Sequence, residues 1–524
     1  MAFLLPPLRT DLEFRKHTDQ RFPWLLEDSI QRIRLPLDSF GYALTQQLLK
    51  PISPNELFRK MESFSTQAID PLLIYRYVLK LQKVGYLEGL RAVHNREIQK
   101  QGSQTDTKDL STLPLSFVAG LQHACQACGS CCSSTDVGPI NSLQAQRINS
   151  HDWTDIIPDL KTNEDVFRTA QFGDQSIILT AMRNDQCIFL SDDKLCLVHR
   201  HLGVDSKPTQ CRQFPYVFSL VNDRIDVSLS MECRAYWKAK KAATPPSEQQ
   251  GMLRELLELG APVHRISTSV GWDTRLMCSE LDYIQWEERM IQSVQETENE
   301  EDVLASIQSM LTRSNELFSR ISAPINKQEE AWVDPAQWAT VFSCSDSSFV
   351  VADNAKRLPL RAILDALSQF SNQAKEVASE RNLTALALRF NFLKNAAASA
   401  GGDINLRSFR WSEPSTAREI IRDVLISGLF SKAVPRLGTI QFGTSLLALR
   451  CFLMVYGACY RAQEACRVSV SVQDLIDSMV TLSKMLREEA VIEFLRDYEH
   501  TLYSALIEEL VQSHRSSDVC NVQR

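Results

Sequence analysis

Four cysteines within eight residues constrain this chain more than any other feature of its sequence. The segment CQACGSCC has the pattern C-x2-C-x2-C-C and contains Cys125, Cys128, Cys131 and Cys132. Thiolates two residues apart on a tight turn can converge on one ion, which is why C-x2-C recurs in zinc and iron–sulfur sites. Gly129 supplies the backbone freedom that such a turn needs. Adjacent thiols on extended backbone point in different directions, which indicates that only one of the last two cysteines is a direct ligand.

A second group of cysteines follows the first. Eight of the 14 cysteines lie between residues 125 and 233, and the other six are scattered. We see no export signal, and a cysteine cluster in a reducing compartment is more often metal-binding or catalytic than disulfide-bonded. The sequence therefore predicts eight candidate metal ligands: Cys125, Cys128, Cys131, Cys132, Cys187, Cys196, Cys211 and Cys233.

The number of thiols bears on the kind of centre. A structural zinc site closes with four ligands, so this set fits either two metal sites or one cluster with additional redox or structural thiols. Soft thiolates select zinc, copper(I) or iron–sulfur over calcium and magnesium. The sequence leaves open whether the cofactor is an iron–sulfur cluster or zinc.

Two residues beside the cysteines have two interpretations each, and two others have an expected packing role. His199 lies three residues after Cys196, a usable metal spacing, but its basic surroundings also fit a solvated turn. Arg212 could donate a hydrogen bond to a ligand sulfur or a substrate carboxylate, or form an ordinary surface ion pair. Phe214 and Pro215 are expected to pack against the cluster and exclude water.

The rest of the chain predicts a mainly α protein with a small α+β cysteine-cluster domain. We expect a winged-helix-like N-terminal domain at 1–93, a polar linker at 94–114, the cysteine domain at 115–244 and a helical domain at 245–524. In the first domain, Ser53 is an expected N-cap, and Gly85 ends a helix before an expected wing. The pattern resembles a winged helix, including the PqqD-like variety that recognises peptides, and a plain helical module is the alternative.

Composition limits the partners. The net charge is −7, which argues against bulk binding to nucleic acid or an anionic membrane. The apolar run at 446–460 carries Arg450 and is shorter than the ~20 residues of a membrane span, so it predicts a buried helix. The basic run at 238–243 is expected to be a solvated helix face. We expect a cytoplasmic protein with no membrane partner, and the oligomeric state is left open.

The order of the two cysteine groups resembles a known family. C-x2-C-x2-CC followed by CIFL and by KPTQCRQFPY is similar to the YkgJ-type, zinc- or iron-chelating family named for its CxxCxxCC core. More loosely, the cysteine pattern and the helical region resemble the flagellin lysine-N-methylase family. That resemblance implies an iron–sulfur protein that methylates lysines of a protein or peptide substrate with S-adenosylmethionine. The chain lacks the Gly-rich loop of Rossmann methyltransferases, and its N-terminal domain is additional.

Three functions follow from these features. The first is a protein-modifying enzyme of the lysine-N-methylase type, with the N-terminal domain presenting the peptide. The second is a non-enzymatic zinc- or iron-chelating protein. The third is a metal- or redox-responsive regulator that binds DNA through its winged helix. The net negative charge of the chain argues against this function. No catalytic residue and no S-adenosylmethionine-binding residue can be named from the sequence.

Overall fold

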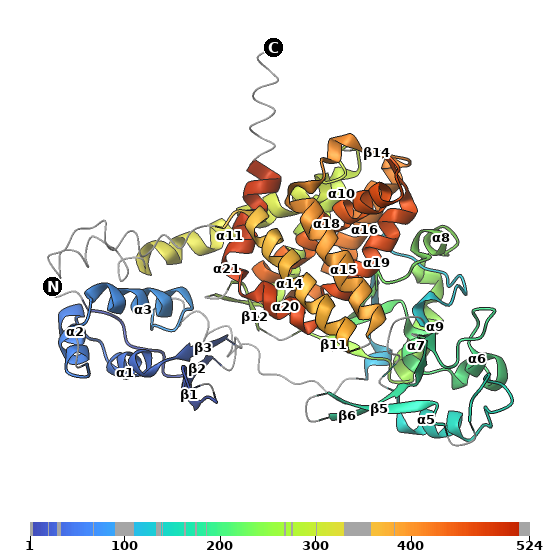
Figure 1. Cartoon of the computed structure of the whole chain (residues 1–524), viewed down its shortest axis with the longest axis horizontal. Helices are drawn as coiled ribbons and strands as arrows, with labels where there is room; N and C mark the ends of the chain where they lie inside the picture. Colours follow the sequence, from blue (N-terminus) through green and yellow to red (C-terminus); the bar gives the residue numbers. More distant parts are fainter. Residues whose placement is uncertain are drawn as a thin grey trace, which may run out of the picture.

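The computed structural model describes residues 4–89, 109–329 and 358–512 (Figure 1). Short gaps within these ranges fall at 19, 29–32, 66–67, 133–137, 139, 162–163, 173–174, 185, 267–268, 274–275, 300 and 382. Helices dominate, and the strands form several small sheets. The predicted mainly α class with some β structure is therefore confirmed.

The N-terminal domain is an antiparallel three-stranded sheet followed by three helices. The elements are β1 (Glu13–Lys16), β2 (Trp24–Asp28), β3 (Ile33–Leu37), α1 (Ser39–Gln47), α2 (Pro54–Glu62) and α3 (Pro71–Lys83). As predicted, Ser53 caps α2 by accepting a hydrogen bond from the backbone N–H of Glu56. Gly85, at φ 72°, follows the end of α3. The domain buries its own apolar cluster, separate from the other two clusters of the described chain.

The expected wing is not confirmed. Within the described residues up to 89, no strand pair follows α3; instead, Leu87 forms an isolated antiparallel bridge with Leu8. The sheet precedes the helices rather than following them. The sequence did not predict these strands because they are short and carry many charges: β1 reads EFRK and is almost wholly exposed.

The central region contains a four-stranded sheet and several short elements. The strands β9 and β10 form an antiparallel hairpin, and the sheet order is β11-β9-β10-β4. The elements are η1 (Leu110–Thr112), β4 (Leu115–Phe117), η2 (Ser130–Cys132), α5 (Ser142–Asn149), β5 (Phe167–Phe172), β6 (Gln175–Thr180), β7 (Met182–Arg183), β8 (Gln186–Cys187), α6 (Leu197–Leu202), η3 (Val204–Ser206), α7 (Thr209–Gln213), β9 (Tyr216–Val221), β10 (Arg224–Leu229), α8 (Tyr236–Lys241) and β11 (Val263–Arg265). The cysteine-rich segment thus contains both short helices and strands.

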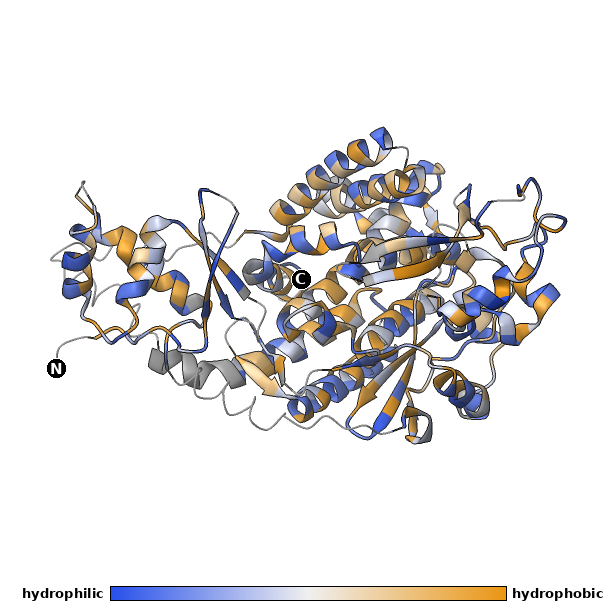
Figure 2. Ribbon diagram, turned by 90° about the horizontal axis from the view of Figure 1, so that it is seen from below, coloured by the Kyte–Doolittle hydropathy of each residue, from blue (hydrophilic) through white to orange (hydrophobic). Residues whose placement is uncertain are grey.

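The C-terminal region is a helical body. Its elements are η4 (Pro246–Gln249), α9 (Gln250–Glu258), β12 (Ser269–Gly271), β13 (Met277–Ser279), α10 (Glu280–Gln295), η5 (Glu296–Asn299), α11 (Ala305–Glu329), α14 (Leu360–Glu380), α15 (Thr384–Ala398), η7 (Ser399–Asp403), η8 (Leu406–Ser408), β14 (Arg410–Trp411), α16 (Pro414–Phe430), α17 (Ala433–Leu437), α18 (Ile440–Glu464), β15 (Ser469–Val470), α19 (Val472–Met485), α20 (Glu489–Arg496), α21 (Glu499–Ile507) and η9 (Glu508–Gln512). Residues 472–507 form three helices in succession, α19, α20 and α21. Most helices carry hydrophobic and hydrophilic residues along their length (Figure 2).

Helix α18 forms the centre of the helical body. It is long and apolar enough to cross a membrane, but 89% of its most apolar window is buried within the fold. That burial is typical of the core helix of a soluble protein and confirms the predicted buried helix. Close packing requires small residues here: a Cβ on Gly443 would press on the carbonyl oxygen of Val434.

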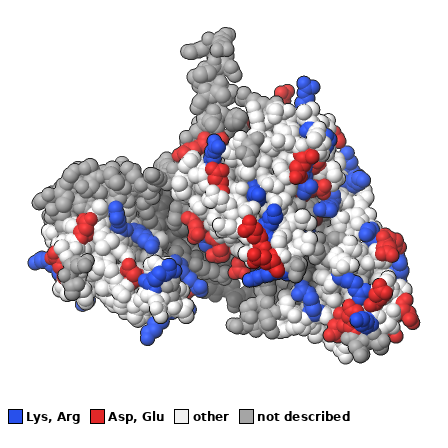
Figure 3. Space-filling view, in the orientation of Figure 1, with Lys and Arg blue, Asp and Glu red and all other residues white. Residues whose placement is uncertain are grey.

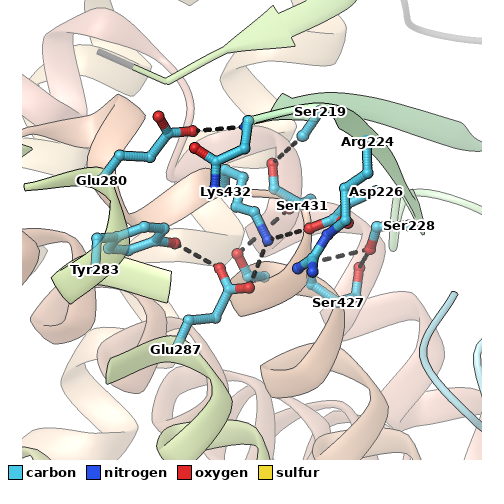
Figure 4. Close-up of polar contacts among 12 residues, drawn as sticks. Ser219, Arg224, Asp226, Ser228, Glu280, Tyr283, Glu287, Ser427, Ser431 and Lys432 are labelled. Carbon is cyan, nitrogen blue, oxygen red and sulfur yellow. Dashed lines mark hydrogen bonds and ion pairs between the residues drawn. The ribbon is translucent and has the colours of Figure 1, made fainter. Parts of the chain in front are cut away.

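A buried ion-pair network joins the central sheet to the helices (Figure 4). Lys432, fully buried in a left-handed backbone conformation at φ 57°, precedes α17. Its ammonium lies 2.7 Å from Asp226 of β10 and 2.5 Å from Glu287 of α10. Tyr283 donates a hydrogen bond of 2.7 Å to the same glutamate. Strands β9 and β10 therefore share one apolar core and one polar network with the helical body.

Candidate metal centre

The first cysteine segment is an irregular loop with two left-handed residues. Residues 121–129 have no regular secondary structure, Ala127 has φ 48° and Gly129 has φ 69°. The loop then closes in the single turn η2, where the backbone N–H of Cys132 donates to the carbonyl of Gly129 at 3.0 Å. The sequence predicted the role of this glycine: its φ lies where side chains with a Cβ are strained.

The two halves of the cysteine pattern meet at this glycine. A Cβ on Gly129 would lie 3.1 Å from a methyl group of Leu190 and 3.0 Å from the Cβ of Lys194. Both residues belong to the loop between β8, which contains Cys187, and α6, which Cys196 precedes. Close packing of the two loops places thiols that are some 55 residues apart in the sequence in one region.

Five thiols are electrostatic neighbours. The sulfur atoms of Cys131 and Cys132 are 3.9 Å apart. The pKa of Cys132 is raised by its contact with Cys131, by burial, and by the charges of Cys131, Cys187 and Cys211. The pKa of Cys211, on α7, is raised first by burial and then by Cys187, Cys196 and Cys131. These mutual influences define a first thiol set, Cys132, Cys187, Cys196 and Cys211, with Cys131 beside it.

The remaining thiols form a second set around Cys233. Burial, followed by the charges of the nearby Cys128, Cys131 and Cys125, raises the pKa of Cys233 to about 12. Cys233 is buried, whereas Cys125 and Cys128 are exposed. Cys131 therefore stands between the two sets, close to Cys132 and electrostatically coupled to Cys233.

One neighbour of the second set was missed by the sequence analysis. The Nε2 atom of His123 lies 3.5 Å from the sulfur of Cys233, and burial lowers the pKa of the imidazole to about 4. Residues 122–124 run beside α8: the N–H of Ala124 donates to the carbonyl of Ala239 at 3.1 Å. The only sequence signal was the H-x-C spacing to Cys125, which does not distinguish a ligand from a core histidine.

Other predicted neighbours are placed as follows. His199 is exposed on α6, as the solvated-turn interpretation has it. Arg212 forms a 2.5 Å ion pair with Glu255 of α9 and lies 3.8 Å from Asp205, which confirms the ion-pair alternative. Lys240 was expected on a solvated face, but this is wrong, because it is buried 2.6 Å from Asp423.

A cavity of about 280 Å³ opens beside the first thiol set. Cys131, Cys132 and Cys211 line it together with Phe214 and Pro215, in agreement with the expected packing of the latter two. Its remaining wall combines apolar and polar residues, and three of them, Lys207, Lys484 and Arg487, are cationic. The residues of that wall include Lys207, Tyr216, Glu232, His264, Lys484 and Arg487.

The donor set fits a soft metal in its chemistry. Burial raises the pKa of Cys187 and Cys211, so these thiols need a nearby cation to become thiolates, and a bound metal ion supplies one. Among the described residues, however, no three His, Cys, Asp or Glu side chains converge closely enough to hold an ion as they stand. The eight-residue ligand assignment therefore stays a prediction.

Comparison with known proteins supports the resemblance drawn from the cysteines. Residues 124–240 match the CxxCxxCC family model, described as "Putative zinc- or iron-chelating domain". No curated protein and no solved structure matches the chain, so the looser similarity to the flagellin methylases has no support from these comparisons. The matched segment contains all eight clustered cysteines and ends within α8. Residues 124–240 are thus similar to a zinc- or iron-chelating domain.

Proposed function

We propose that the protein binds zinc or an iron–sulfur cluster through its clustered thiols, beside a cavity from which a small ligand can reach the centre. The observation that carries this proposal is that Cys131, Cys132 and Cys211 line one cavity, and that Cys187 and Cys196 lie near enough to Cys211 to raise its pKa. A structural zinc site is closed by its protein ligands, whereas catalytic sites keep one side open. The cavity favours a centre that meets a ligand over a purely structural one.

The two thiol sets support two metal sites. Cys132, Cys187, Cys196 and Cys211 would form a four-thiolate site. Cys125, Cys128, Cys131 and Cys233 would form the other, with His123 next to it. Bound metal would supply positive charge for the buried thiolates, and an iron–sulfur cluster would also supply electron transfer.

Metal analysis of serine variants tests this proposal. We expect Cys196→Ser and Cys211→Ser to lose the same share of bound zinc or iron, and Cys125→Ser and Cys128→Ser to lose the remaining share. Each loss should lower the thermal midpoint, because metal binding is coupled to folding. The control is Cys466→Ser, which changes an exposed cysteine outside the cluster. Full metal content in all four cluster variants would refute the ligand assignment.

Protein lysine N-methylation is the more specific form of this proposal. In this form of the proposal, a donor such as S-adenosylmethionine would bind in the cavity beside the thiols, and the N-terminal domain, with its own core, would hold a protein or peptide substrate. The test is binding of labelled S-adenosylmethionine to anaerobically purified protein, followed by transfer to co-expressed proteins. If there is neither binding nor transfer, we favour the non-enzymatic chelating protein.

Binding of DNA by the N-terminal domain has less support. On the face in Figure 3, lysines and arginines are interspersed with aspartates and glutamates over the described residues rather than forming one continuous basic surface. Phosphate contacts need clustered basic side chains. A salt-dependent shift of labelled duplex DNA by the full chain would favour the regulator instead.

A further inference from the structure

A second cavity, which we call the basic pocket, adjoins the cysteine loop. Its volume is about 330 Å³, and it lies between that loop and the helices α15, α18 and α19. The lining residues are Ser130, Arg234, Ala385, Leu388, Arg389, Phe392, Arg461, Val480, Thr481 and Lys484. Ser130 belongs to the CGSCC segment itself, so the pocket touches the candidate metal centre.

The charge of the basic pocket is one-sided. Four of its lining residues are cationic, and no lining residue is acidic. Asp477 lies 3.6 Å from the Nε of Arg234, and Glu488 lies 3.9 Å from Arg389, but neither carboxylate lines the pocket. The lining of the pocket thus carries positive charge only.

The guanidinium group of Arg461 has a buried N–H that donates no hydrogen bond. Its guanidinium carbon lies 4.4 Å from the centroid of the Phe392 ring, a stacking distance. Its Nε atom is buried and has no hydrogen-bond partner in the described structure. A buried donor without a partner is costly, so an acceptor supplied by a ligand would stabilise this arrangement.

The cations also repel one another. The pKa of Lys484 is lowered, first by burial and then by Arg389, while Glu232 opposes the shift and Arg234 and Arg487 add to it. A cleft lined by one sign of charge concentrates ions of the opposite sign. Binding an anion would remove this repulsion.

We propose that the basic pocket binds the carboxylate or phosphate group of a small molecule whose other end reaches the thiols. Arginine side chains suit such oxyanions because their paired N–H groups match two oxygens at once. Ser130 and Thr481 add hydroxyl donors, and Leu388, Phe392 and Val480 provide an apolar wall for the body of the ligand. Lys484 lines both cavities, so the bound anion would lie next to the cavity of the first thiol set.

A second explanation for the cations is that they only offset negative charge on the thiolates. Against this, none of the residues that line the basic pocket is a cysteine, whereas Lys207 and Arg487 line the cavity that contains the thiols. Arg389 and Arg461 lie on α15 and α18, far along the chain from the cysteine segments. Their charges are arranged around the empty volume of the basic pocket.

Calorimetric titration of the full, metal-loaded chain tests the proposal. The probes are inorganic phosphate and, separately, acetate, at low ionic strength. We expect saturable binding of at least one probe at one site per chain, weakened at least tenfold by Arg389→Gln and by Lys484→Gln. The matched control, Arg313→Gln, changes an exposed arginine paired with Glu316 on α11 and should bind like the parent chain. Circular dichroism confirms that each variant is folded.

The outcomes separate this proposal from the metal proposal. Stronger binding of phosphate than acetate identifies a phosphorylated ligand, and the reverse identifies a carboxylate. Non-saturable binding, or equal binding by all variants, would refute anion binding by the basic pocket even if the metal content is full. Specific anion binding by a chain that retains no metal would support the pocket while refuting the metal centre.

Discussion

Removing the charge of Lys432 should destabilise the protein strongly. In Lys432→Met, Asp226 and Glu287 remain buried without their common cation. Breaking a buried ion pair from one side typically costs about 3–5 kcal/mol, because the remaining charge stays in a poorly solvating site. Methionine keeps the length of the side chain and the same left-handed backbone conformation, so the loss of charge is the main change.

The expected shift in thermal midpoint follows from the size of the folding unit. Unfolding entropy is about 2.1 cal/mol/K per residue, so a unit of roughly 370 residues has about 0.8 kcal/mol/K. A cost of about 3–5 kcal/mol then lowers the midpoint by roughly 4–6 °C. Scanning calorimetry of the full chain measures this shift.

The pH dependence of the shift has a definite sign. The pKa of Glu287 is already raised by burial, and Lys432 is the main influence that opposes this rise. Without the lysine, the folded pKa rises further above the unfolded value, so stability present at low pH is lost as pH increases through the folded pKa. The difference between variant and parent should therefore be larger at pH 8 than at pH 5. The neutral triple variant Lys432→Met, Asp226→Asn, Glu287→Gln should recover most of the loss. A single variant within 1 °C of the parent at both pH values would refute this reasoning.

Three further predictions rest on local features. Gly443→Ala should destabilise the helical body by about 1–3 kcal/mol in urea unfolding, because the new methyl group presses on the Val434 carbonyl, whereas Gly251→Ala, in open space on α9, should not. The His264 side chain is exposed, but partial desolvation of its ring, together with Arg436 and Arg487, lowers its pKa to about 4. The unfolded chain therefore takes up this proton first, and stability should fall as pH decreases from about 6.5 to about 4; an NMR titration midpoint above 6 for this imidazole would contradict the assignment. Ser53→Ala removes the N-cap of α2 and should cost about 1 kcal/mol, seen as a lower midpoint of the N-terminal domain, while Ser63→Ala, at the other end of that helix, serves as its control.

The cysteine pattern predicted the position of the candidate site because its information is local. Spacing within CQACGSCC requires a tight turn, and Gly129 takes the conformation that this turn needs. The proposed assignment of Cys131 and Cys132 to different thiol sets could not be made from the sequence, since it depends on where α7 and the turn before α8 place Cys211 and Cys233. Adjacent residues in the sequence can have different neighbours in space.

The basic pocket and the Lys432 network were invisible to sequence reasoning for a different reason. Arg389, Arg461 and Lys484 each look like an ordinary polar residue on an amphipathic helix. Only the packing of α15, α18 and α19 brings them together. The N-terminal sheet was missed because strand β1 has no alternating pattern of buried and exposed residues, a signal on which strand prediction depends.

The buried network also has a consequence for the order in which the protein can mature. All eight clustered cysteines have been synthesised once residue 233 has been added, whereas Lys432, the buried cation that pairs with Asp226, follows much later in the chain. During synthesis, the segment that contains Asp226 is therefore complete before this cation has left the ribosome. A metal ion bound early by the thiols would hold the loops of this region together during that interval. The helical body would then pack against a segment that the bound metal ion has already ordered.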